Sequence, residues 1–262
     1  MEDVSVSITT DDGIRLHVVG QPGKMPIVFS NSLGTDIGLF DGQFEAFKSD
    51  RAVWRYDTRG HGRSDVPASE SSIEQLGADL IAVINATGTR PVDLCGVSIG
   101  GITALWVAIH APERVRRIVL ANTGAKIGNL DLWTERIRAA RADGMGVLAQ
   151  ASMQRWFTEG FRQRRPEIVE RFRTTFEGTS VEGYISCCAA LRDADLRSLA
   201  SRVSCPTLVV TGALDPATPP ADGKWLADQI PGAHVVELDA AHLSNVERRE
   251  EFNSAVHDFL TR

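Results

Sequence analysis

The sequence is poor in the features that mark membrane-spanning, secreted and metal-binding proteins. Its longest apolar stretch, Ile102 to Ile109, is far shorter than the roughly 20 residues that cross a bilayer. The first residues, Met1-Glu2-Asp3, show no basic and apolar signal pattern. No two histidines stand at ligand spacing beside a carboxylate, so no metal is predicted. We therefore expect a soluble, cytoplasmic protein that engages no membrane and needs no cofactor.

Cysteine and positive charge are also scarce. Only 4 of the 262 residues are cysteines, and Cys187 and Cys188 are adjacent, so neither a zinc site nor a disulfide framework is indicated. We interpret all four as buried or inert thiols. Lys and Arg number 28 against 34 Asp and Glu, which argues against a nucleic-acid partner because phosphate binding needs clustered basic side chains. The 43% of hydrophobic residues can still form one large core.

The hydrophobic pattern predicts an α/β protein. Residues 4–8 and 14–19 alternate at period two around Asp11-Asp12-Gly13, which indicates an antiparallel hairpin. The short unbroken apolar runs that follow are typical of buried parallel strands, and helical segments lie between them. This order predicts a mostly parallel eight-stranded sheet with helices on both faces. The runs are 27–29, 52–54, 92–95, 115–120, 207–210 and 235–238, and the helices are 38–47, 72–87, 99–111, 220–230 and 244–260.

The strand-like runs stop between residues 126 and 200. Large apolar side chains from Leu132 to Tyr184 recur there at roughly helical spacing, and the strand pattern restarts after Cys205-Pro206. We predict a helical cap over residues 125–201, inserted after the sixth strand. The remaining residues, 1–124 and 202–262, form the predicted core.

The strongest motif is Gly96-Val97-Ser98-Ile99-Gly100, which follows an expected strand and precedes an expected helix. This is the context that a G-x-S-x-G nucleophile elbow requires. The sharp turn exposes the hydroxyl of Ser98, and the flanking glycines remove Cβ atoms that would collide with neighbouring segments. The turn also directs the backbone N–H of Ile99 toward any oxyanion formed there. We predict Ser98 as a nucleophile; a stray glycine-serine turn is the alternative.

A serine nucleophile needs a base and an acid that orients the base. His242 is the best-placed histidine because it follows the last predicted strand, at the carboxyl edge of the sheet. Asp215 directly follows the strand at 207–210 and is the predicted orienting acid, with Asp239 as the alternative. The histidines that we interpret as structural are His17, His110 and His257.

The chain order Ser98, Asp215, His242 resembles the α/β-hydrolase family over essentially the whole length. The predicted cap matches the family's helical cap after the sixth strand. Family members commonly carry a His-Gly dipeptide after the third strand, and the next residue offers a second oxyanion donor. This sequence has Asn31-Ser32-Leu33-Gly34 there instead. The resemblance therefore implies an oxyanion hole formed by the N–H groups of Leu33 and Ile99.

More narrowly, the segments 31–36, 56–64 and 215–220 resemble the 3-oxoadipate enol-lactonases of aromatic catabolism. In the middle segment, Arg59 and His61 are expected to brace a loop. The resemblance implies hydrolysis of a small anionic lactone to 3-oxoadipate, in the β-ketoadipate pathway. A carboxylesterase or a cofactor-free perhydrolase would share the same catalytic residues, and a non-catalytic ligand-binding protein is an alternative of another class.

An anionic substrate needs a cationic partner in a partly desolvated pocket. Trp133, Arg136 and Ile137 share one face of a predicted cap helix, so that face offers an apolar wall and one guanidinium together. We predict Arg136 as the partner of the substrate carboxylate and Trp133 as a tentative contact. Arg138 is a weaker candidate because it points elsewhere in an ideal helix. Solvated arginines and a tryptophan in the cap core are the alternatives, and the oligomeric state stays open.

Overall fold

The computed structural model describes residues 4–261, and its centre is one eight-stranded sheet in the order β1-β2-β4-β3-β5-β6-β7-β8. β1 pairs antiparallel with β2 and β2 with β4, whereas all other neighbours are parallel. The predicted α/β sheet is confirmed. The strands are β1 (Val4–Thr9), β2 (Arg15–Gly20), β3 (Ile27–Ser30), β4 (Val53–Tyr56), β5 (Val92–Val97), β6 (Val115–Ala121), β7 (Thr207–Gly212) and β8 (His234–Leu238).

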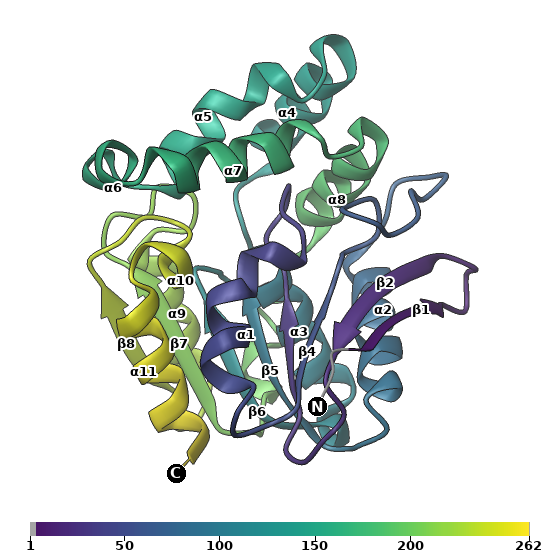
Figure 1. Cartoon of the computed structure of the whole chain (residues 1–262), viewed down its shortest axis with the longest axis vertical. Helices are drawn as coiled ribbons and strands as arrows, with labels where there is room; N and C mark the ends of the chain where they lie inside the picture. The colour runs from purple at the N-terminus through teal and green to yellow at the C-terminus, as the bar shows by residue number, and fades with distance from the viewer. Residues whose placement is uncertain (1–3, 262) are drawn as a thin grey trace.

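Helices cover both faces of the sheet. Figure 1 shows α1 and α11 in front of the sheet and α2, α3 and α9 behind it. β3, β4, β5 and β7 are buried along their whole length, as unbroken apolar runs between two helical layers require. The helices are α1 (Asp41–Phe47), α2 (Ile73–Ala86), α3 (Ile99–His110), α9 (Pro220–Gln229), α10 (Ser244–Glu247) and α11 (Arg249–Thr261).

Five further helices connect β6 to β7 and lie over one end of the sheet (Figure 1). Their inner faces carry aromatic rings that pack edge to face, such as Trp156 against Phe172 and Phe176. We propose that residues 125–201 form a cap on a core of residues 1–124 and 202–262, and we use these two names below. The cap helices are α4 (Leu130–Asp143), α5 (Gly146–Trp156), α6 (Glu159–Arg164), α7 (Pro166–Glu177) and α8 (Val181–Asp193).

Two elements differ from the sequence prediction. The single helix expected over 244–260 is broken at Arg248, whose backbone leaves the helical region at φ −121° and ψ 51°. The side chain of Arg248 turns back to donate to the carbonyl and the carboxylate of Asp239. β8 is an edge strand rather than a buried one, with Val235 41% exposed. An apolar run by itself does not distinguish a central strand from the last strand of a sheet.

The cysteines behave as the sequence indicates. All four are buried, and none forms a disulfide. Burial raises the pKa of each thiol, so little reactive thiolate exists near neutral pH. None of the helices within residues 4–261 has both the length and the apolar character of a membrane span.

Candidate active site

Ser98 occupies a strained turn between β5 and α3. Its φ of 58° and ψ of −120° lie in a region that residues with a side chain rarely adopt. Neighbouring segments hold this backbone in place. Its N–H donates to the carbonyl of Ala121 (3.1 Å), and its carbonyl accepts from the N–H of Gly101 (2.9 Å) and the hydroxyl of Thr123 (2.8 Å). The turn is thus fixed by the sheet on one side and the helix on the other.

The glycines around Ser98 are required by close backbone approaches. A Cβ on Gly96 would lie 2.2 Å from the carbonyl oxygen of Gly100. A Cβ on Gly100 would lie 2.0 Å from the carbonyl oxygen of Ser30, at the end of β3. Both distances are far below contact, so the G-x-S-x-G spacing follows from steric exclusion in this turn.

Asp215 and His242 form a buried pair at the ends of β7 and β8. The Nδ1 of His242 donates to Oδ2 of Asp215 over 2.8 Å. The carboxylate also accepts from Asn122 Nδ2 (3.0 Å) and the Thr218 hydroxyl (2.7 Å). Burial favours the neutral acid, but the nearby His242 and these hydrogen bonds outweigh it and lower the pKa of Asp215. The ionised carboxylate keeps the proton of His242 on Nδ1, which leaves Nε2 free to accept one.

A cavity of about 150 Å³ lies where the cap meets the core, and both Ser98 and His242 line it. Ser98 comes from the core turn after β5, and His242 from the loop between β8 and α10. Asp215 lies behind this cavity, hydrogen-bonded to His242. The structure therefore brings Ser98, Asp215 and His242 to one place. A hydroxyl, an imidazole and a carboxylate in this arrangement can form a serine nucleophile with its base and orienting acid.

Leu33 lines the same cavity, and its backbone N–H donates to no acceptor in the described part of the chain. The N–H of Ile99 lies in the first turn of α3, where helices leave N–H groups without internal acceptors. Two such donors beside Ser98 could hold an oxyanion. The hydroxyl and N–H of Thr35 both donate to the carbonyl of Ser32, so this loop is stabilised without the usual glycine.

His61 supports the loop of Leu33 through hydrogen bonds, as the sequence predicts. Its Nε2 accepts from the N–H of Gly34 (2.9 Å), and its Nδ1 donates to the carbonyl of Arg59 (3.1 Å). This pattern requires the neutral imidazole. Burial lowers the pKa of His61 to about 4, so the ring is neutral at physiological pH and can act as the acceptor.

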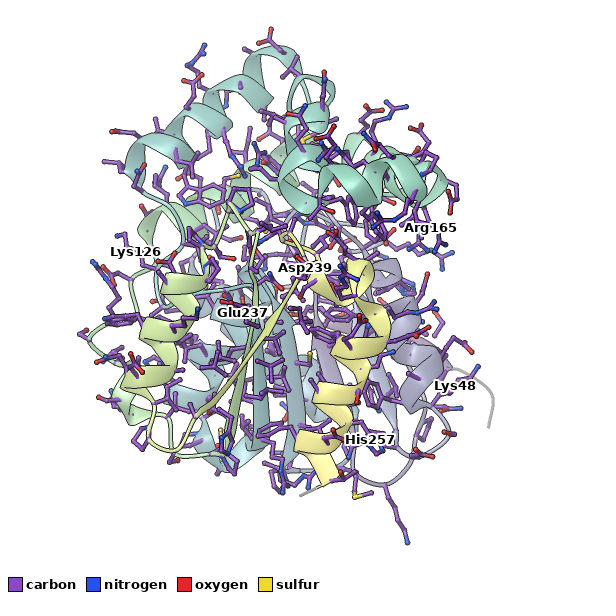
Figure 2. The ribbon with its side chains drawn as sticks, turned by 90° about the vertical axis from the view of Figure 1, so that its left-hand side faces the viewer. Lys48, Lys126, Arg165, Glu237, Asp239 and His257 are labelled. Carbon is purple, nitrogen blue, oxygen red and sulfur yellow. The ribbon has the colours of Figure 1, made fainter. Side chains whose placement is uncertain are left out.

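The alternative residues lie elsewhere. Asp239 is exposed and pairs with Arg248 rather than with a histidine. Figure 2 shows Asp239 near the end of the sheet that faces the cap and His257 lower down on α11, on the outside of the molecule. His110 stacks on Trp106 at 4.4 Å between ring centroids, and His17 is buried in β2. None of these side chains lines the cavity of Ser98.

The two arginines predicted on α4 have different environments. Arg136 lines the cavity, with its guanidinium 5.0 Å from the ring centroid of Trp133, which also lines it. The indole N–H of Trp133 donates to the carbonyl of Ile127 (2.7 Å), so that ring is fixed. Arg138 points to solvent and pairs with Glu135, away from the cavity. The prediction of Arg138 as a substrate contact is therefore wrong. Arg138 lies two positions after Arg136, and two positions along an α-helix turn a side chain by more than half a turn.

Sequence reasoning missed Arg155. This half-buried residue on α5 also lines the cavity, and its guanidinium donates to the Ser152 hydroxyl over 3.0 Å. Burial, together with the like charge of Arg136, lowers the pKa of Arg155 to about 10, so it still carries its charge near neutral pH. Within residues 4–261, neither arginine pairs with a carboxylate. The i, i+3, i+4 pattern of Ser152, Arg155 and Trp156 was a usable signal, since it repeats the one around Arg136.

Comparison with known proteins agrees with this geometry. Residues 25–248 match the family model described as alpha/beta hydrolase fold. The chain belongs to the α/β-hydrolase family. It is 42% identical to 3-oxoadipate enol-lactonase 2 of Acinetobacter baylyi, over 96% of this chain and 94% of that protein. It is 38% identical to 3-oxoadipate enol-lactonase 1 of the same organism, over 98% and 97%. The crystal structure of the enol-lactonase from Burkholderia xenovorans LB400 superposes with a TM-score of 0.95 at 39% identity, over 98% and 100%.

Proposed function

We propose that this protein hydrolyses 3-oxoadipate enol-lactone to 3-oxoadipate, with Ser98 as nucleophile, His242 as base and Asp215 as orienting acid. The observation that carries the substrate class is the pair Arg136 and Arg155, two charged groups without carboxylate partners in the cavity of Ser98. Both are half-buried, and a partly desolvated cation without a counter-ion carries a cost that an anionic substrate reduces. The likeness to proteins named as enol-lactonases supports the particular lactone.

The proposed first half of the reaction uses Ser98 and His242 directly, with Asp215 behind His242. His242 Nε2 takes the hydroxyl proton of Ser98 as Oγ attacks the lactone carbonyl carbon. The carbonyl oxygen becomes an oxyanion, which the N–H groups of Leu33 and Ile99 stabilise; one such donor is typically worth about 3 kcal/mol of barrier. Collapse breaks the ring C–O bond and releases an enolate oxygen, which His242 can protonate. The enol then becomes a ketone, so the ring does not reclose.

The second half regenerates the enzyme. Water gives a proton to His242 and its oxygen attacks the acyl carbon on Ser98. Collapse of this second tetrahedral intermediate returns the proton from His242 to Ser98 Oγ and frees the new carboxylic acid, which gives its remaining proton to solvent and becomes a carboxylate. The product carries one more negative charge than the substrate, and Arg136 and Arg155 both lie on the cavity wall. No metal or other cofactor is needed for any step.

The test compares the enol-lactone with neutral short-chain aryl esters. We expect the wild-type protein to prefer the lactone. Arg136→Ala and Arg155→Met should each raise KM for the lactone by roughly tenfold or more, because a charge-assisted contact to the carboxylate is lost. Arg138→Ala is the matched control from the same helix and should leave KM unchanged. A preference for the neutral esters would support a general carboxylesterase instead.

Ser98→Ala separates an enzyme from a ligand-binding protein. We expect its turnover to fall by several orders of magnitude, because triad members act as a unit. Binding of the product should persist, since the cap arginines are untouched. Undiminished turnover in this variant would exclude Ser98 as the nucleophile.

A further inference from the structure

The loop that carries His242 is hydrogen-bonded to the end of the cap helix α5. The backbone N–H of His242 donates to the carbonyl of Arg155 (3.4 Å), and the next N–H, of Leu243, donates to the carbonyl of Trp156 (3.0 Å). Arg155 and Trp156 are the last two residues of α5. Carbonyls at a helix end lack partners within the helix, so they can accept from another segment. The backbone around His242, the proposed base, is therefore held against the cap by two hydrogen bonds.

Glu247 joins the same two segments through its side chain. Its Oε2 accepts from the N–H of Thr158 in the cap (3.1 Å) and from the N–H of Ala241 in the core (3.2 Å). Its Oε1 accepts from the hydroxyl of Thr158. Ala241 immediately precedes His242 in the chain. One carboxylate thus connects the residue before the proposed base to a cap residue three positions beyond Arg155.

We propose that Glu247 is a positioning residue that holds the His242 loop against cap residues 155–158. The proposal rests on the proposed role of His242 as base. Arg155 belongs to both parts of this arrangement, because its carbonyl holds the His242 backbone while its guanidinium faces the cavity. The group that would bind the substrate carboxylate and the group that would move the proton are then fixed relative to each other. Proton transfer is sensitive to such placement, since a misplacement of about 1 Å can cost roughly a hundredfold in rate.

The side chain at position 247 needs oxygen atoms that accept hydrogen bonds, but it does not need a negative charge. In Glu247→Gln, the amide oxygen can accept from both backbone N–H groups, and the amide nitrogen can donate to the Thr158 hydroxyl oxygen. In Glu247→Ala, both N–H groups lose their acceptor. Glu250→Ala is the matched control, because it removes an exposed carboxylate from the neighbouring helix, and Glu250 makes no hydrogen bond or ion pair with the cap within residues 4–261.

The experiment measures Ser98 reactivity in two ways. The first is the rate at which an uncharged aryl phosphonate labels Ser98, which needs the base but no carboxylate contact. The second is kcat and KM for the enol-lactone. We expect Glu247→Ala to lower the labelling rate and kcat together, by about 10- to 100-fold. Glu247→Gln should stay within about threefold of wild type, and Glu250→Ala should match it.

Three results would overturn the proposal. These are labelling of Glu247→Ala at the wild-type rate, a rise in KM alone, or equal impairment of the Gln and Ala variants. If Glu247→Ala does not fold, Thr158→Val and Thr158→Ser carry the test: Val should slow labelling, Ser should restore it, and equal rates would overturn the idea. A wild-type protein that is labelled but does not hydrolyse the enol-lactone would refute the proposed substrate alone.

Discussion

Single residues in the Ser98 turn show how steric exclusion prepares a nucleophile. The backbone of Ser98 is held at a positive φ by hydrogen bonds to β6 and α3. At Gly96 and Gly100 the surrounding backbone leaves no space for a Cβ atom. The strain is local, but the structure around it must compensate for its cost. The side chain of Ser98 consequently lies at the tip of a tight turn, and Gly96 and Gly100 allow the backbone to approach closely on either side of it.

We predict that Gly100→Ala destabilises the protein by at least about 3 kcal/mol, because its Cβ would meet the backbone of Ser30, which cannot move without disrupting β3. Urea unfolding followed by circular dichroism measures this change. Gly146→Ala, also near a helix start, is the control. No atom lies within 4 Å of its added Cβ, so its stability should be unchanged or slightly higher. Similar losses in the two variants would contradict the steric explanation.

His61 makes the loop of Leu33 sensitive to acid. Its pKa falls from 6.5 in the unfolded chain to about 4 in the fold, so between these values the unfolded chain binds the additional proton. The stabilisation by neutral His61 is complete above about pH 6.5 and is lost as the pH falls toward 4. At pH 5 we expect a loss of roughly 2 kcal/mol relative to pH 7 from this group.

His61→Gln tests that dependence, because its amide oxygen can accept from Gly34 but does not titrate. The drop in unfolding free energy between pH 7 and pH 5, measured by urea titration, should be smaller in this variant than in wild type. Equal drops in the two proteins would show that His61 does not carry the effect.

At the scale of elements, a buried ion pair ties three segments together. Arg59, after β4, donates to Asp79 on α2 from Nε and Nη2 (both 2.6 Å) and also pairs with Asp12 in the β1–β2 turn. Arg59 and Asp79 are almost completely buried. Because the carbonyl of Arg59 also accepts from His61, this pair indirectly supports the loop that carries Leu33.

We predict that Asp79→Ala costs about 3 kcal/mol, because it leaves the buried guanidinium of Arg59 with only the half-exposed carboxylate of Asp12 as a partner. The control is Asp65→Ala, which breaks the exposed pair with Arg15 and should cost far less, because solvent screens that pair. Thermal and urea unfolding of both variants provide the comparison. Equal costs would mean that burial of the Arg59 pair does not determine its contribution.

At the scale of the whole molecule, the candidate site exists only where the cap meets the core. The core supplies Ser98, Leu33 and His242, and the cap supplies Arg136 and Arg155. Two guanidinium groups beside the proposed nucleophile lead us to expect that this junction favours anions. A ligand that bridges the two parts should stabilise the entire fold, since it binds only the native state.

We predict that adipate, a dianion close in shape to the proposed product, raises the melting temperature. At about a hundredfold excess over Kd the gain should be near 2.7 kcal/mol, or roughly 5 °C or more for a chain of this size. Hexane-1,6-diol has the same length without charge and should give no shift. Arg136→Ala combined with Arg155→Met should abolish the effect of adipate. An equal shift with the diol would contradict the role of the two arginines.

The sequence by itself determined the sheet, its helices and the elbow at Ser98. These depend on short-range properties: apolar runs, turn residues and glycines within a few positions of one another. It did not reveal the break at Arg248 or the exposure of β8, because neighbouring segments decide both. Which arginine faces the cavity and what holds His242 were decided only by the tertiary structure. Arg155 and Glu247 are 92 positions apart in the chain, and only the packing of the cap on the core brings their segments into contact.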